Sequence, residues 1–326
     1  MMSSIRNSGQ IKEIKEILNA ELGFFGNPNT KNDSVECSIC ESVANFLFTK
    51  NSFALYRCSN CEFLFAPINT PDNSISDFFE NSKAIDLYTS KVIENEAARK
   101  SAIFRPLAKR IIATHPEAKK ILEIGCGAGL LLDELRLAGL GTLDIQGVEV
   151  NRFAAERSIE KGHDIFQGAI DDFKGENFDV VVFWAFLDHI PDPLALFRRI
   201  NGLLGNGGLL IFGNANYAGF ETSIMGTESH IYSVPERLSF FTPRTLEILC
   251  HKAGFNNTSI EGSGNLDLEI VKDWWENTPE IPKNDFLYSV MNNHEIAQNF
   301  TLFLQKTLLT SHLTVSTWKQ TNQLSR

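Results

Sequence analysis

The sequence predicts an α/β protein with an open, mostly parallel sheet that carries helices on both faces. The first observation is that apolar segments of strand length alternate with segments of helical length between residues 119 and 262, which is the pattern of right-handed crossover units. The second is a glycine-rich turn directly after the first strand. The third is a set of paired cysteines that indicates a separate N-terminal module.

Each element of this alternation can be placed by its residues. The expected strands are 120–124, 145–150, 164–167, 178–185 and 208–213. The expected helices are 128–138, 152–162, 192–204 and 242–253, and 75–114 and 285–318 are also expected to be helical. The chain thus divides into an N-terminal amphipathic helix (1–34), a cysteine module (35–66), a helical linker (67–114), a sheet domain (115–262) and a mostly helical extension (263–326).

The bulk composition limits the possible function classes. A chain of 326 residues with 43% hydrophobic content can form a large core and a smaller module without disulfides. A formal net charge of −10 argues against a protein whose main function is to bind nucleic acid. No apolar stretch is long enough to cross a membrane, and the N-terminus shows no secretory signal. We therefore expect a cytoplasmic protein with reduced cysteines.

The turn after the first strand has the features of a nucleoside-binding loop. Gly125, Gly127 and Gly129 allow a ligand to approach the backbone, and the following helix offers free N–H groups. The spacing G-x-G-x-G does not fit the dinucleotide pattern G-x-G-x-x-G. The alternative is that the glycines only close a tight turn between strand and helix.

Two carboxylates narrow the choice of ligand. Glu123, just before the turn, would repel a pyrophosphate but suits a ligand with an ammonium and a sulfonium group. Glu149 ends the next strand, where a carboxylate can accept both ribose hydroxyls. Together they favour S-adenosylmethionine (SAM) over NAD. The alternative for Glu123 is an ordinary surface carboxylate near a strand end.

With these features the sequence resembles the SAM-dependent class I methyltransferases. The stretches that match their motifs in order are 123–129, 147–150, 178–182, 187–193, 203–211, 235–242 and 253–255. The resemblance implies a Rossmann-like, doubly wound, mostly parallel sheet of seven strands. It also implies that Gly125 and Gly127 contact the methionine part of SAM and that Glu149 holds the ribose.

The adenine contact is less well marked in the sequence. In these enzymes the turn after the third strand often carries an acid near the adenine amine, but Ala169 stands at that place. The candidates that remain are packing by Ile170 and a hydrogen bond from the adenine amine to Asp171. The neighbouring Asp172 can equally be explained as the cap of a turn.

Two C-x-x-C pairs near the N-terminus indicate a metal site. The expected ligands are Cys37, Cys40, Cys58 and Cys61. Seventeen residues separate the pairs, which is typical of a zinc ribbon. A site with four protein ligands has no open position, so the zinc is expected to be structural. Iron suits four thiolates as well, and the alternative is that the thiols are simply buried, as we expect for Cys126 and Cys250.

The cysteine module, the linker and the core together resemble bacterial enzymes that methylate nucleotide-linked sugars and related small molecules. With residues 263–326 after the core, the larger C-terminal domain of the sugar C-methyltransferases is not expected in this sequence. The expected acceptor is therefore a sugar nucleotide or another small metabolite. The N-terminal helix and the tail near Trp318 are candidates for a homodimer contact or for packing on their own core.

The transfer step needs a group that removes a proton, because methyl transfer is a displacement in which the enzyme mainly positions the two partners. His189 follows the fourth strand at the carboxyl edge of the sheet and is the candidate base. Asp188 is expected to orient it or to touch the ligand. Tyr217 and His230, in the long connection after the fifth strand, are further acid–base candidates. The alternative for each is a capping, packing or surface role.

The sequence thus favours a SAM-dependent methyltransferase with a small-molecule acceptor. A second interpretation keeps SAM but makes the zinc module a recognition element for protein or RNA. A third is a SAM-binding protein without catalysis. An NAD-dependent oxidoreductase is disfavoured by the glycine spacing.

Overall fold

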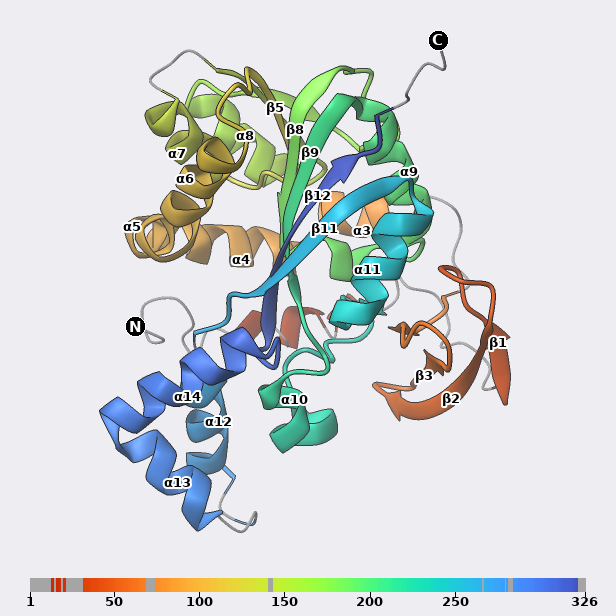
Figure 1. Ribbon diagram of the computed structural model, residues 1–326, viewed down its shortest axis with the longest axis vertical. Helices are drawn as coiled ribbons and strands as arrows, with labels where there is room; N and C mark the ends of the chain where they lie inside the picture. The colour runs from red at the N-terminus through yellow and green to blue at the C-terminus, as the bar shows by residue number, and fades with distance from the viewer. Residues whose placement is uncertain are drawn as a thin grey trace.

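The computed structural model describes most of the chain (Figure 1). The described residues are 13–14, 16–18, 20–21, 32–68, 74–139, 143–265, 267–278, 280 and 284–321. Within the expected N-terminal helix, residues 13–14, 16–18 and 20 are helical, and Leu18 is buried against the rest of the molecule. Residues 1–12, 15, 19 and 22–31 of that expected segment lie outside the described part.

The centre of the molecule is a mixed sheet, to which the described residues contribute seven strands. The strands are β5 (Lys120–Ile124), β6 (Asp144–Glu149), β7 (Asp164–Gln167), β8 (Phe178–Trp184), β9 (Leu204–Ala215), β11 (Phe255–Gly262) and β12 (His312–Lys319). Their order is β11-β12-β9-β8-β5-β6-β7, and only β12 runs antiparallel to its neighbours among these strands. The predicted doubly wound, mostly parallel sheet is confirmed.

One strand of this sheet comes from a segment that the sequence pattern assigned to a helix. Residues 285–318 were expected to be helical, but His312–Lys319 forms β12 and lies between β9 and β11. The segment contains the β-branched residues Thr314, Val315 and Thr317, and Leu313–Thr317 are all buried because both faces of the sheet are covered at this strand. The expectation of helix up to residue 318 is therefore wrong at this end.

Successive side chains of the central strands point to opposite faces of the sheet and pack into two separate hydrophobic cores. Val180 and Val182 of β8 pack with α6 (Arg105–Thr114) and α7 (Leu130–Ala138) on one face of the sheet. Val181 and Phe183 pack with α9 (Pro193–Leu203) and α11 (Pro243–Lys252) on the other. This period of two follows from the pleat of a strand that is buried on both faces. With α8 (Arg152–Glu160) beside β6 and β7, the helices cover both faces (Figure 1).

The segment before the sheet is helical, as its pattern predicted. It comprises α3 (Ser74–Asn81), α4 (Lys83–Glu94), α5 (Glu96–Arg99) and a π-helical turn at Lys100–Phe104 that leads into α6. Ser82 caps α4 by accepting a hydrogen bond from the Ile85 backbone N–H. Ion pairs of Lys100 with Glu96 and Asp133 join this segment to α7.

The cysteine module is an antiparallel sheet that takes in a strand from the main domain. Its strands are β1 (Ser34–Glu36), β2 (Val43–Lys50), β3 (Phe53–Cys58) and β4 (Leu64–Phe65). The connection after β9 contains α10 (Phe220–Met225) and β10 (Ser239–Phe240), and β10 pairs with β4. The module is thus joined to the main domain by backbone pairing.

The helices near the C-terminus form a separate layer with its own small core. They are α12 (Asp267–Glu276), α13 (Asp285–Asn292) and α14 (His294–Lys306), and α13 and α14 project away from the sheet in Figure 1. None of the helices in the described residues combines the length and the apolar character needed to cross a bilayer.

Candidate functional site

A large cavity opens at the carboxyl edge of the sheet. Its volume is about 1100 Å³, and parallel sheets of this kind bind ligands at this edge. Most of the residues predicted for the site line it: Glu123, Gly125, Gly127, Glu149, Ile170, Asp171, Asp188, His189 and His230. Residues of α4, the π-helical turn and α6 line it as well, so the helical linker forms one of its walls.

The glycine turn offers space to a ligand at one of its glycines. Gly125, Gly127 and Gly129 all have positive φ values, of 68°, 52° and 76°. A Cβ atom at Gly127 would have no described atom within 4 Å, although Gly127 lines the cavity. At Gly129 it would lie 2.5 Å from Ser158 Oγ. Gly127 therefore borders ligand space, whereas Gly129 permits packing against α8.

Substitution of these two glycines should separate binding from folding. Gly127→Ala should fold with a modest cost of about 1 kcal/mol for its positive φ, yet weaken the binding of SAM at least about tenfold because its methyl group enters the ligand space. Gly129→Ala should instead lower the melting temperature strongly. Thermal unfolding and calorimetric titration check both, and equal SAM affinity in wild type and Gly127→Ala would contradict the placement of the ligand.

Glu149 is held in position by the backbone around it. Its Oε2 accepts a hydrogen bond from the Gly127 N–H at 2.7 Å, and its Oε1 accepts one from the Asn151 N–H at 2.8 Å. Burial raises the pKa of this carboxyl, and these two hydrogen bonds act in the opposite direction. Each oxygen keeps a further lone pair, so the group can also accept hydroxyl donors from a ligand in the cavity.

A contact that the sequence did not indicate closes the site beside Glu149. The side-chain amide of Asn151 donates to the Phe79 carbonyl at 3.0 Å and to Asp86 Oδ1 at 2.9 Å. These bonds attach α3 and α4 to the start of α8. A pairing between residues 65 and 72 positions apart carries no local sequence signal, and only the fold brings these groups together.

Glu123 is a buried carboxyl that lacks a partner on one oxygen. Its side chain lines the cavity with 3% exposure, and Oε2 makes no hydrogen bond to any described residue. Burial raises the pKa of Glu123 well above its ordinary value, and Glu149 and Asp133 raise it further. An unpartnered buried carboxyl of this kind fits a cationic ligand group, which would supply the missing interaction.

His189 lies on a short 3-10 turn, η3 (Leu187–His189), and faces the same cavity. Its Nδ1 is 2.7 Å from the Glu236 carbonyl oxygen. Because a carbonyl only accepts, Nδ1 carries the proton, and in the neutral ring Nε2 keeps its lone pair. The ring of Phe79 meets the imidazole edge to face at 4.9 Å. The arrangement leaves Nε2 as the basic atom.

Asp188 does not orient His189 as expected. No hydrogen bond joins the two side chains in the described part of the chain, and the orienting partner is the Glu236 carbonyl. Asp188 is 3% exposed and faces Arg237 instead, with Oδ2 3.6 Å from Nη1. Burial raises the pKa of Asp188, and the Arg237 charge opposes that shift. The sequence could not have indicated that Glu236 orients His189, because the contact uses its backbone carbonyl and every residue has one.

The position of Tyr217 does not fit the acid–base role that the sequence suggested. It is not among the described residues that line the cavity, and its hydroxyl donates to the Glu62 carbonyl and accepts from Arg57 Nε at 3.2 Å. Burial raises the pKa of Tyr217 to about 12. The residue joins the cysteine module to the main domain, which corrects the expectation of a catalytic tyrosine. His230 does line the cavity and is exposed.

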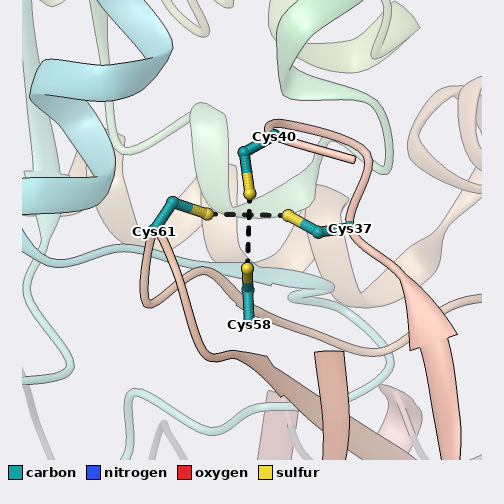
Figure 2. Close-up of side chains that lie close together, drawn as sticks. All are labelled: Cys37, Cys40, Cys58 and Cys61. Atoms are coloured by element: carbon teal, nitrogen blue, oxygen red, sulfur yellow. Dashed lines mark hydrogen bonds between the residues drawn. The ribbon is translucent and has the colours of Figure 1, made fainter. Parts of the chain in front are cut away.

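The cysteine ligands predicted from the sequence converge on one point (Figure 2). The atoms concerned are the Sγ atoms of Cys37, Cys40, Cys58 and Cys61, all within 4.8 Å of one another. Cys37 and Cys61 are 3.6 Å apart and Cys40 and Cys58 are 3.3 Å apart. A tetrahedral zinc ion with bonds of about 2.3 Å needs sulfur separations of about 3.8 Å, so small outward shifts suffice. Cys126 and Cys250 are buried elsewhere in the molecule.

Comparison with known proteins agrees with this arrangement. A family model for the methyltransferase domain matches residues 96–260, half of the chain. The chain is similar to the ubiquinone biosynthesis O-methyltransferase of Vibrio parahaemolyticus, with 32% identity over 126 residues, 36% of this chain and 54% of the relative. A relative of the same name from Chromobacterium violaceum is 28% identical over 173 residues, 49% of this chain and 75% of the relative. The chain thus spans about half the length of the Vibrio relatives it matches.

Solved structures show the same fold at low sequence identity. Haemonchus contortus phospholethanolamine N-methyltransferase 2 is 16% identical with a TM-score of 0.50, covering 96% of this chain and 75% of that one. The plantazolicin methyltransferase BpumL is 14% identical with a TM-score of 0.50, covering 76% of this chain and 94% of that one. The strand order and the matched family model lead to one conclusion: the chain belongs to the methyltransferase-domain family and has the class I methyltransferase fold.

Proposed function

We propose that this protein is a SAM-dependent methyltransferase that acts on a small molecule. The observation that carries the proposal is that one cavity joins the glycine turn and its two buried carboxyls to the free Nε2 of His189. Cofactor and acceptor can therefore bind next to each other in the same cavity. The volume, about 1100 Å³, slightly exceeds the range typical of pockets for one small ligand, roughly 300–1000 Å³, which leaves room for both partners.

The residues of the cofactor end have distinct roles in this proposal. Glu149 accepts the ribose hydroxyls, and the turn at Gly125 and Gly127 contacts the methionine part. Glu123 faces the ammonium and sulfonium charges, and Ile170 and Asp171 border the adenine. When bound, SAM supplies an electrophilic methyl group, and the protein holds it in line with the acceptor. This division places the negative side chains opposite the positive groups of SAM, and α3 and α4 are attached beside Glu149 through Asn151.

At the acceptor end His189 takes the proton. An acceptor hydroxyl that donates to Nε2 would lose its proton to the imidazole while its oxygen bonds to the methyl carbon, and the bond from that carbon to the sulfur would break to release S-adenosylhomocysteine. Asp188 and Arg237 lie beside it as a fixed pair of opposite charges. The names of the ubiquinone biosynthesis relatives support an oxygen acceptor. A nucleotide-linked sugar is the other acceptor class that we include.

The metal site is proposed as structural zinc. Four thiolates leave no open coordination position, and the module packs its metal end against the main domain, where the Cys61 carbonyl accepts from Thr245 Oγ1 at 2.8 Å. This docking favours a structural role over recognition of protein or RNA. We also propose that the methyltransferase domain extends from residue 115 to the end of β12, beyond the boundary at 262, since β12 belongs to its sheet.

The proton on Glu123 gives a test of the cofactor site. A carboxyl whose pKa is raised above 4.5 in the free protein holds its proton at higher pH, and a cation bound beside it favours the ionised form. SAM binding should therefore release a proton, and SAM affinity should rise with pH until the pH exceeds the raised pKa. Calorimetry in two buffers of different protonation enthalpy measures the release, which Glu123→Gln should abolish. A heat of binding independent of buffer would count against the contact.

Transfer itself is tested with labelled SAM and a panel of phenols, catechols, nucleotide sugars and other small metabolites. We expect the label in an ether of one acceptor class. His189→Gln should lower kcat by about 100-fold and leave the SAM dissociation constant within about twofold, because Nε2 serves the proton transfer only. Exposed His251→Gln is the matched control. Equal rates in both variants would remove His189 from the chemistry.

A further inference from the structure

Residues 236–240, called the bridge segment here, touch both the cysteine module and the turn that carries His189. On the side of the turn, the bridge segment makes a hydrogen bond to each of three successive residues. The Glu236 carbonyl accepts from His189 Nδ1 at 2.7 Å, and the Leu238 N–H donates to the Asp188 carbonyl at 2.8 Å. Ser239 Oγ donates to the Ile190 carbonyl at 2.6 Å. The bridge segment therefore fixes the backbone of the turn and the orientation of the imidazole.

On the other side, the bridge segment is a strand of the module. Ser239 pairs with Phe65 and Phe240 with Leu64, and the Ala66 N–H donates to the Leu238 carbonyl at 2.9 Å. Ser239 and Leu64 are fully buried. A pairing of two residues on each side cannot hold itself together, so the position of the bridge segment depends on what fixes β4.

The metal ligands fix β4. Cys61 lies three positions before Leu64, and the Cys58 N–H donates to the Phe63 carbonyl at 2.8 Å. Phe63 stacks on Phe65 at 4.9 Å and packs against Phe241 at 5.3 Å, next to the bridge segment. The second knuckle, β4 and the bridge segment thus form one continuous set of contacts from the sulfur cluster to His189.

We propose that the metal module is a positioning element for the transfer site: metal bound by the cysteines holds the bridge segment, and the bridge segment holds the His189 ring with Nδ1 protonated and the lone pair on Nε2. Ser239 is the positioning residue through which this acts, since its backbone pairs with Phe65 of the module and its hydroxyl donates to the Ile190 carbonyl of the turn. The proposal rests on the proposed function for the meaning of Nε2, but the positioning itself is a structural statement.

The test is nitrogen-15 NMR of the histidine rings in the full chain. The chain has seven histidines, and His189→Gln assigns the signal of interest. Zinc-loaded wild type should show His189 as a single tautomer, with an Nδ1 proton protected by the Glu236 carbonyl. Removing the metal with a chelator, or making Ser239→Ala, should raise the solvent exchange of that proton at least about tenfold and give a mixture of tautomers.

Two controls make the result decisive. Ser316→Ala removes another buried hydroxyl, on β12, and should leave the His189 signal unchanged. Circular dichroism and SAM titration, run in parallel, report on the main sheet and the cofactor end. Should metal removal unfold the whole chain, Ser239→Ala decides alone. An unchanged Nδ1 proton in folded, metal-free protein or in Ser239→Ala would overturn the proposal. Absence of SAM binding with a normal His189 response would instead reject the proposed function and keep the positioning role.

Discussion

Replacing Glu149 by alanine should weaken SAM binding by about 100-fold, equivalent to about 2.7 kcal/mol. The carboxylate is 9% exposed and already receives the Gly127 and Asn151 N–H groups. A ribose would add two hydroxyl donors to the same acceptor, and hydrogen bonds to charged groups contribute about 1.5–3 kcal/mol each. The variant loses these contacts and also leaves two backbone N–H groups without their acceptor.

The experiment is calorimetric titration of zinc-loaded protein with SAM, with NAD as the control ligand. Glu149→Gln keeps the shape of the side chain but cannot accept on both atoms, and it should fall between wild type and alanine. Glu156→Ala, an exposed carboxylate on α8, should bind like wild type. A well-folded wild type that binds NAD and not SAM would reject the cofactor assignment. Equal SAM affinity in Glu149→Ala would show that the carboxylate is not a ligand contact.

Cys58→Ser should lower the metal content and the stability of the protein together. The serine hydroxyl is a poor ligand for zinc, and the module has little core of its own beyond the residues around the sulfur atoms. Loss of a structural metal site costs at least about 3 kcal/mol, which corresponds to a fall of roughly 6 °C or more in melting temperature. The largest effect is expected in the module, because β10 is its main backbone pairing with the sheet domain.

Metal analysis and thermal unfolding of the same samples measure both quantities. Cys250→Ser is the matched control, because Cys250 is equally buried but lies on α11 and is not one of the four clustered thiols. It should retain a full complement of metal. An unchanged melting temperature and full zinc retention in Cys58→Ser would show that the cysteines do not act as a metal site. Iron in place of zinc would be visible in the same metal analysis.

The glycine turn with its two carboxyls and the cluster of four cysteines could be predicted because their signals are local. Glu123 and the glycine turn are contiguous, Glu149 ends the next strand, and each cysteine pair is a tight knuckle. Such groups are positioned by a single strand–turn–helix unit or a single loop, so spacing along the chain determines spacing in space. The alternation that predicted the parallel sheet has the same origin, because buried strands and covering helices differ in period.

The surroundings of His189 could not be predicted in this way because they are assembled from segments that lie far apart in the sequence. His189 was found from its place after a strand, but its tautomer depends on the Glu236 carbonyl, 47 positions away. Tyr217 was predicted to lie in the site because it belongs to the long connection after β9. In the structure this connection runs to the cysteine module, where Tyr217 bonds to Glu62 and Arg57. β12 was missed because a strand with neighbours on both edges is recognised by its partners, β9 and β11, and its own residues alternate only weakly.

The sequence by itself thus determined the fold class, the glycine turn with its two carboxyls and the cysteine cluster, since each depends on contacts within a short stretch of chain. The tertiary structure decided which of the candidate side chains line the cavity, which group orients His189, and where the sheet ends. The physical reason is that every residue has a backbone carbonyl, so the side-chain sequence does not indicate which carbonyl accepts a given hydrogen bond or which strands pair. They exist only when the packing of the whole domain brings β4, the bridge segment and η3 side by side.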